Sequence, residues 1–193
     1  MTEKQYLTRF DEIRSLASAS YAYYVSSPSP LAAKRKVEDD FLEFLIEAYL
    51  FGNVQTEEQL GSEHQEPSLG DIEAVVYEKI EGETFKDRVD KHLDARDEGM
   101  LCNLAESEYH RVFNHAMENA AKRIMEWTGL GYKTWHTMED DRVRDTHTYL
   151  DGVKISVKRS FSTYDGDYAM RPGAFRKAEN NVNCRCWLTY SWF

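Results

Sequence analysis

The sequence lacks a hydrophobic stretch long enough to cross a membrane. No run of eighteen or more uncharged apolar residues occurs, and the most hydrophobic segment, residues 41–50, is interrupted by two glutamates. The polar start, Met1 to Gln5, does not resemble a secretory signal. These absences exclude a transmembrane helix, and they predict that the protein stays in the cytoplasm of the cell that makes it.

Cysteine is scarce, and basic residues are scarce in most of the chain. The three cysteines are expected to be reduced thiols or metal ligands. Residues 1–132 hold 14 Lys and Arg against 26 Asp and Glu, a net charge of −12, whereas residues 133–193 hold 10 against 8, a net charge of +2. Because each neutralised phosphate needs a basic side chain, the acidic part argues against general wrapping of nucleic acid. The basic residues of the C-terminal part favour a solvated strand edge, with a local basic face as the alternative.

Three long helices are predicted, over residues 5–24, 32–51 and 100–127. Apolar residues at helical spacing indicate the first and the third, and apolar residues on most sides indicate that the second is mostly buried. Prolines separate the first two helices, because proline lacks the N–H that a helix interior needs. Gly52 is expected to end the second helix. Gly129 and Gly131 are expected to close the third.

Two shorter helices are predicted between the long ones, over residues 69–80 and 85–96. Each starts at a hydroxyl residue with an acid three residues later, Ser68 with Asp71 and Thr84 with Asp87, which is the spacing of a capping box. Residues 55–67 are polar and aperiodic and are predicted to form a surface connection or a mobile loop.

After Gly131 the pattern changes from helical spacing to alternation. Residues 152–158 and 183–193 alternate and predict half-buried strands. Residues 160–181 are predicted to be a long loop that is either functional or mobile. The predicted fold class is therefore α+β, with a helical N-terminal region and a small, mainly antiparallel C-terminal β module packed on a long helix.

Cys184 and Cys186 are one residue apart and should point to the same side of their strand. They could bind one soft metal ion such as zinc, with His147 as a further ligand, although no fourth ligand is evident. The alternative is a buried thiol pair beside a hydrogen-bonding histidine. Apolar residues on the same strand face favour this alternative, because a buried free cysteine behaves as a small hydrophobe.

Asp141, Arg144 and His147 fall three residues apart and would share one face of a helical turn. In that geometry the arginine can donate two hydrogen bonds to the aspartate, while the histidine donates one to a carboxylate or a carbonyl. Such a triplet can orient a catalytic base or pin a turn to a sheet. Pinning is favoured, because no nucleophile or phosphate-binding loop accompanies it.

Glu108, Arg111 and Asn114 are also three apart, on the longest predicted helix, beside its apolar stripe. The favoured interpretation is a solvated helix face with an ion pair inside the helix. A buried polar contact to the C-terminal module is the alternative.

Several motifs lie in one order along the chain. They are Lys133-Thr134-Trp135, Asp141-Arg142-Val143-Arg144-Asp145-Thr146-His147, Leu150-Asp151-Gly152 and Asn183-Cys184-Arg185-Cys186-Trp187, preceded by segments 82–89 and 106–114. This order and spacing resemble the phage Mu protein F-like family of minor head proteins. The resemblance implies a fold-stabilising or binding role for Trp135, Asp141, Arg144, His147, Gly152, Asn183, Cys184 and Cys186. It also implies a head morphogenesis domain over residues 67–193, helical over 67–131 and β-rich over 132–193, after a helical region with a polar linker over 1–66.

The function implied by the resemblance is that of a non-enzymatic phage or prophage minor capsid protein. Members act near the portal vertex during procapsid assembly, and some are packaged with the DNA. The expected partners are phage portal and capsid or scaffold proteins, with a weak DNA contact and no membrane. The expected location is the virion, and the host bacterial cytoplasm during assembly. Two alternatives remain: a metal-dependent hydrolase or nuclease using Asp141, His147, Cys184 and Cys186, and a small host-side protein-binding module.

Overall fold

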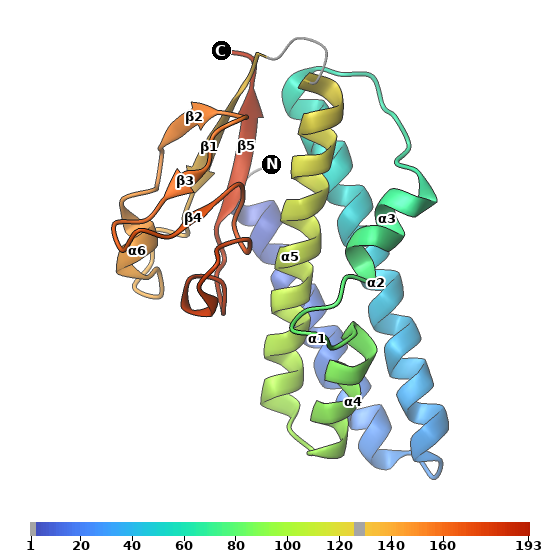
Figure 1. The fold of residues 1–193 in the computed structure, drawn as a ribbon. Helices are drawn as coiled ribbons and strands as arrows, with labels where there is room; N and C mark the ends of the chain where they lie inside the picture. The colour runs from blue at the N-terminus through green and yellow to red at the C-terminus, as the bar shows by residue number, and fades with distance from the viewer. Residues whose placement is uncertain (1–2, 126–129) are drawn as a thin grey trace.

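The computed structural model describes residues 3–125 and 130–193, with side chains from Arg9 onward. The fold is α+β, as predicted: a helical body lies beside a small antiparallel β module (Figure 1). The long helix α5 (Glu98–Met125) stands between the two parts and contacts both. Within the described ranges, no helix is long and apolar enough to cross a membrane.

The helical body is built on α1 (Glu3–Ser26) and α2 (Pro30–Leu60), which pack against each other and against α5. The predicted break between α1 and α2 is present, and Pro30 is the first residue of α2, where its missing N–H costs nothing. Aromatic side chains fill the interface with α5. The rings of Phe10 and Tyr109 meet edge to face with centroids 5.3 Å apart, and Tyr109 stacks on Phe113.

The prediction that Gly52 ends the second helix is wrong. The helix continues to Leu60 and ends at Gly61, whose φ of 61° is the left-handed conformation of a helix C-cap. Gly52 serves the packing instead. A Cβ atom there would lie 2.7 Å from the backbone oxygen of Phe113, so the glycine allows α2 and α5 to approach closely.

The prediction of a surface connection over residues 55–67 is therefore wrong for its first part, which is the last part of α2. Three polar residues of this part, Gln55, Thr56 and Glu57, are buried. The carboxylate of Glu57 accepts hydrogen bonds from the Asn53 amide, the Gln65 backbone N–H and the Arg123 guanidinium, and lies 2.7 Å from His64 Nδ1. Residues 62–68 form the connection to α3.

Both capping boxes form as predicted. Ser68 caps α3 (Leu69–Val76) and Thr84 caps α4 (Phe85–Asp94), and each hydroxyl is paired reciprocally with the acid three residues later. Both helices end earlier than predicted. Residues 77–84 contain a tight turn, and Arg96 takes a positive φ of 54°, which is outside the helical region.

The apolar stripe predicted for the third long helix is present in α5, where Leu101, Ala105, Val112, Ala116 and Ala120 are fully buried. The predicted end at Trp127 and the closing Gly129 lie outside the described residues. The helix begins at Glu98, and the carboxylate of Asp97 accepts the Met100 backbone N–H at 3.0 Å.

The β module contains a three-stranded antiparallel sheet in the order β2-β1-β5, formed by β1 (Tyr132–His136), β2 (Lys154–Ser156) and β5 (Trp187–Ser191). The strand predicted over residues 183–193 is shorter because β1 ends at His136, opposite Trp187, and offers no partner to residues 184–186. Trp187, the first residue of β5, is buried and stacks on His136.

The β module is fastened to α2 as well as to α5. The Gln59 side-chain oxygen accepts the Tyr190 backbone N–H at 2.8 Å, and the Trp192 indole donates to the Leu60 backbone oxygen at 2.9 Å. The buried apolar cluster is continuous from α1 to β5. The boundary at residue 67 stays a prediction.

The predicted long loop over residues 160–181 contains a two-stranded hairpin, β3 (Phe161–Ser162) with β4 (Tyr168–Ala169), and the short helix η1 (Ala178–Asn180). The buried carboxylate of Asp167 holds residues 160–181 together through hydrogen bonds. Its carboxylate accepts backbone N–H groups of Tyr168, Arg176 and Lys177 and the side-chain amide of Asn180. These bonds satisfy a charge that would otherwise be costly to bury.

Candidate functional site

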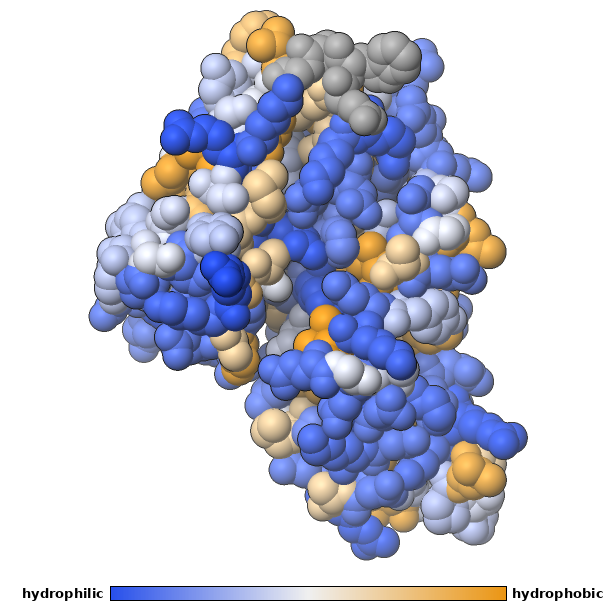
Figure 2. Space-filling view, viewed as in Figure 1, coloured by the Kyte–Doolittle hydropathy of each residue, from blue (hydrophilic) through white to orange (hydrophobic). Residues whose placement is uncertain are grey.

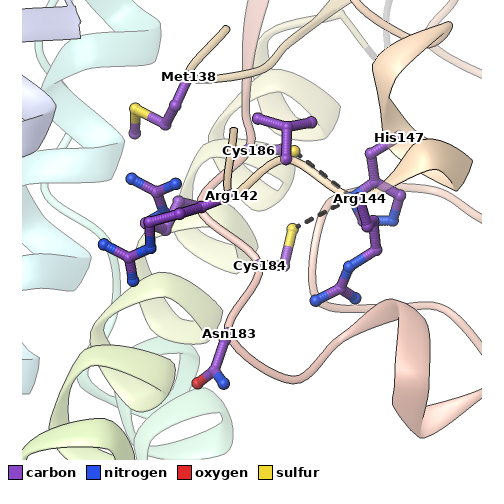
Figure 3. A pocket seen from close by; sticks show the side chains of 9 residues that line it. Met138, Arg142, Arg144, His147, Asn183, Cys184 and Cys186 are labelled. Carbon is purple, nitrogen blue, oxygen red and sulfur yellow. Dashed lines mark hydrogen bonds between the residues drawn. The ribbon is translucent and has the colours of Figure 1, made fainter. Parts of the chain in front are cut away.

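Three side chains of the predicted site meet in one buried cluster: His147, Cys184 and Cys186. The Nδ1 atom of His147 lies 3.6 Å from Cys184 Sγ and 3.5 Å from Cys186 Sγ (Figure 3). The three residues are only 1%, 6% and 4% exposed, respectively. Together they form the one group of His, Cys and acidic side chains in the described part of the chain with the geometry of a metal site.

Two short segments present these side chains. His147 belongs to the single turn α6 (Asp145–Thr148), and the cysteines lie on the extended segment just before β5. Asn183, immediately before the first cysteine, has a φ of 55°, a left-handed conformation that asparagine tolerates better than most residues. In Figure 3 its side chain points away from the two sulfur atoms.

The predicted pairing of Arg144 with Asp141 is wrong. Arg144 precedes α6 in an extended conformation, so it does not share a helical face with Asp141, which is exposed. Its guanidinium donates instead to the backbone oxygens of Glu179 and Val182. Arg144 thus ties α6 to the segment that leads into the cysteines, which is a pinning role with different partners.

Aromatic rings surround the imidazole of His147. Trp135, fully buried on β1, meets it edge to face at 5.5 Å, and Phe175 stacks on it at 5.2 Å. Phe161 in turn contacts Trp135 at 5.0 Å. Sequence reasoning identified Trp135 but missed both phenylalanines, which come from the segment expected to be a loop.

The two thiols differ in acidity because they interact with each other. Burial opposes ionisation of Cys184, but hydrogen bonding from Cys186, together with His110 and His147, lowers the pKa of Cys184 well below its usual value. The neighbouring Cys184 and burial raise the pKa of Cys186. Cys184 is therefore the more readily ionised thiol of the pair. A thiolate is the form of cysteine that binds metals.

The cavity beside the cluster is very small. Its volume is about 10 Å³, and it is lined by the cluster together with Met138, Arg142, Val143, Arg144, Asn183 and Arg185. A space of that size holds about one water molecule. The cluster therefore has room for an ion or a water, but not for an organic substrate.

Gly152 and Asp151 shape the turn that follows α6. Gly152 has a φ of 70°, and its N–H donates to the Trp135 backbone oxygen at 2.9 Å. The Asp151 carboxylate accepts the Thr137 backbone N–H at 2.6 Å. These bonds hold the turn against β1, next to Trp135.

The favoured interpretation of Glu108, Arg111 and Asn114 as a solvated face is wrong, since all three are buried. The predicted ion pair exists, with Arg111 Nη2 2.8 Å from a Glu108 oxygen. The other Glu108 oxygen pairs with Arg88 of α4 at 2.6 Å, and Arg111 also donates to the Val75 backbone oxygen at 2.8 Å. Glu108 and Arg111 therefore join α5 to α3 and α4.

Asn114 makes a buried polar contact to the β module, which was the alternative interpretation of these three residues. Its side-chain amide lies 3.4 Å from the backbone oxygen of Cys186, which also lies 2.9 Å from His110 Nε2. His110 and Asn114 of α5 thus hold the segment that carries the two cysteines, residues 184–186, against the helix. His110 was missed because its role depends on a residue 76 positions later.

A second polar group of the β module, at Lys133, was also missed. Lys133 of β1 is 1% exposed, donates to the Met170 backbone oxygen at 2.6 Å, and lies over the Phe161 ring. Burial lowers its pKa to about 8. It lines a cavity of about 370 Å³ that includes Glu118 and Tyr190 but no residue of the cluster.

Comparisons with known proteins agree with the motifs. The sequence model of the family described as "Phage Mu protein F like protein" matches residues 72–189, which include α5, the cluster and most of β5. The minor head protein GP7 of Bacillus phage SPP1 is 33% identical over 86 residues, or 45% of this chain. The match spans only 28% of that relative's length. No solved structure matches the chain significantly.

Proposed function

This chain belongs to the phage Mu protein F-like family, and on that basis we propose that it is a minor head protein acting in phage head morphogenesis. We place its action at the portal vertex during procapsid assembly. It is made in the host bacterial cytoplasm and ends in the phage head. The observation that carries the proposal is the family match over residues 72–189, and the name of the minor head protein from SPP1 supports it.

The geometry of the cluster supports a role without catalysis. Three of the four candidate catalytic side chains, His147, Cys184 and Cys186, are buried, while Asp141 is exposed. The cavity beside the three has a volume of only about 10 Å³. A hydrolase or nuclease would need room for its substrate and an ordered nucleophile. The cluster fits a role in holding α6 against the cysteine segment.

The surface supports docking on a basic partner. The residues up to 132 carry a net charge of −12, the difference between 14 basic and 26 acidic side chains. Figure 2 shows a face that is mainly hydrophilic, with apolar residues scattered over it. Complementary charge raises the rate and specificity of association more than its strength. We therefore propose that the helical body contacts portal, capsid or scaffold proteins largely through charge.

The test is affinity purification from cells that co-express the tagged chain with the portal protein or with capsid and scaffold proteins. The expected result is recovery of the portal protein, weakening as salt rises because the Debye length falls from about 30 Å at 0.01 M to about 3 Å at 1 M. Nuclease treatment before elution serves as the control for bridging by DNA. Recovery of none of these proteins at low salt contradicts the proposal, and recovery that nuclease abolishes replaces it with DNA binding.

A further inference from the structure

We propose that His147, Cys184 and Cys186 bind one zinc ion. Their three ligand atoms lie within 4.8 Å of one another, and all three side chains are buried. Cysteine thiolates and a histidine nitrogen are the ligands that zinc prefers in proteins.

The distances within the cluster match a tetrahedral zinc site. With Zn–S bonds of about 2.3 Å and a Zn–N bond of about 2.0–2.1 Å at tetrahedral angles, sulfur and nitrogen lie about 3.6 Å apart. The observed separations of His147 Nδ1 from the sulfur atoms of Cys184 and Cys186 are 3.6 and 3.5 Å. The two sulfur atoms lie within 4.8 Å of each other, so one ion between the three atoms can reach all of them.

Hydrogen bonding alone explains the arrangement less well. A ring nitrogen carries either one hydrogen or one lone pair, so Nδ1 of His147 can make a good hydrogen bond to only one sulfur atom at a time. Both sulfur atoms nevertheless approach this nitrogen at nearly equal distance. A metal ion satisfies all three atoms together.

The surroundings leave one coordination position, and the ligands balance the charge of the ion. The cavity of about 10 Å³ beside the cluster has the size of a single water molecule, which would be the fourth ligand. Two thiolates neutralise Zn²⁺, and two of the three arginines that line the cavity are already engaged. Arg185 pairs with Asp140 at 2.7 Å, and Arg144 donates to backbone oxygens.

The site would be structural even with water as its fourth ligand, because the cavity of about 10 Å³ beside it has no room for a substrate. It joins α6 to the segment before β5, two parts of the chain separated by more than thirty residues, and it adjoins the fully buried Trp135. Binding releases the remaining thiol protons to solvent, and it favours the folded chain because the unfolded chain does not hold the three ligands together.

The first measurement uses the whole chain, purified without chelator under reducing conditions. Elemental analysis should find about one zinc per chain, and removal of the metal by a chelator should lower the melting temperature. Adding zinc back should restore it. A protein that holds no zinc as purified, and whose melting temperature zinc leaves unchanged, overturns the proposal.

The second measurement locates the ion by replacing zinc with cobalt. Cobalt bound by thiolates should give charge-transfer absorption together with the intense visible bands of tetrahedral coordination. Cys184→Ser and Cys186→Ser should each weaken the charge-transfer band, and His147→Ala should alter the visible bands. Cys102→Ser is the matched control, because Cys102 is a buried free thiol on α5 outside the cluster. Unchanged spectra in folded Cys184→Ser and Cys186→Ser proteins, or a spectrum lost in Cys102→Ser, contradict this site. If the cluster variants do not fold, the presence or absence of the cobalt thiolate spectrum in the wild-type chain decides.

Discussion

Gly52 of α2 lies directly against Phe113 of α5: a Cβ atom on Gly52 would be 2.7 Å from the Phe113 backbone oxygen and 3.0 Å from Ala116 Cβ. Neither neighbour can move away easily, because one is helix backbone and the other is a short side chain on the same helix. The absence of a side chain at position 52 therefore sets how closely the two longest helices approach.

The first prediction follows from this contact. Gly52→Ala should destabilise the fold by about 1–3 kcal/mol, because overpacking outweighs the gain of roughly 1 kcal/mol that alanine brings to a helix interior. Chemical denaturation measures the difference. Gly99→Ala is the matched control: it also lies in a helix, but its nearest neighbour is 3.6 Å away, so it should be neutral or stabilising. Equal effects of the two substitutions would refute the close-approach explanation.

The second prediction concerns the buried carboxylate of Glu108. Burial opposes its ionisation, but Arg111 and Arg88 outweigh burial and lower the pKa of Glu108. Because its folded pKa lies below its unfolded pKa, its stabilising effect is present above the unfolded value of 4.5 and is lost as pH falls through the folded value.

Glu108→Gln should therefore cost about 3 kcal/mol at neutral pH, since it removes the buried charge that pairs with Arg111 and Arg88. The difference from wild type should shrink in acid. The control is Glu12→Gln, which breaks the exposed pair with Arg9 and should cost less than about 1 kcal/mol. Urea denaturation at several pH values distinguishes the two. A loss for Glu108→Gln that is no larger than the control's would show that the buried pair does not stabilise the fold.

The third prediction concerns Lys133, whose pKa burial lowers to about 8. Between about pH 8 and the ordinary lysine value of 10.5, the unfolded chain binds a proton that the folded chain has released. Stability contributed by this residue should therefore rise with pH over that window. Lys133→Met removes the titration, so the stability of wild type relative to this variant should increase from pH 8 to 10. A constant difference across the window contradicts the lowered pKa.

The fourth prediction separates Arg144 from Asp141. Arg144→Ala removes hydrogen bonds to the backbone oxygens of Glu179 and Val182 and should destabilise the fold by about 1.5–3 kcal/mol. Arg144→Lys should not restore the lost stability, because a lysine ammonium cannot reproduce the two hydrogen bonds of the planar guanidinium. Asp141→Ala should change stability by less than about 0.5 kcal/mol, as expected for an exposed residue. Thermal denaturation of the three variants checks this. A larger loss for Asp141→Ala than for Arg144→Ala would restore the original pairing of these two residues.

Features that depend on neighbouring residues were predictable from the sequence. Ser68 and Thr84 cap helices because their partners lie three residues away. The stripe from Leu101 to Ala120 follows helical spacing, and it identifies the core face of α5 without knowledge of the rest of the fold.

Features that depend on distant contacts were not predictable. Gly52 has the residue type of a helix end, and only its contact with the backbone of Phe113, distant in sequence, explains the glycine at this position. Arg144 has an aspartate at helical spacing in the sequence, but its partners are backbone oxygens more than thirty residues away. Buried charges such as Glu57 and Asp167 also look like surface residues, because the bonds that satisfy them come from several segments.

The most direct test of the proposed function is the protein composition of phage particles. Procapsids and mature heads are purified from cells in which the gene is either intact or disrupted, and each protein is quantified by mass spectrometry. The account predicts that this chain is present in particles in far fewer copies than the major capsid protein, and that its loss reduces the yield of infectious heads. Absence of the chain from both procapsids and heads, with unchanged yield when the gene is disrupted, would contradict the account.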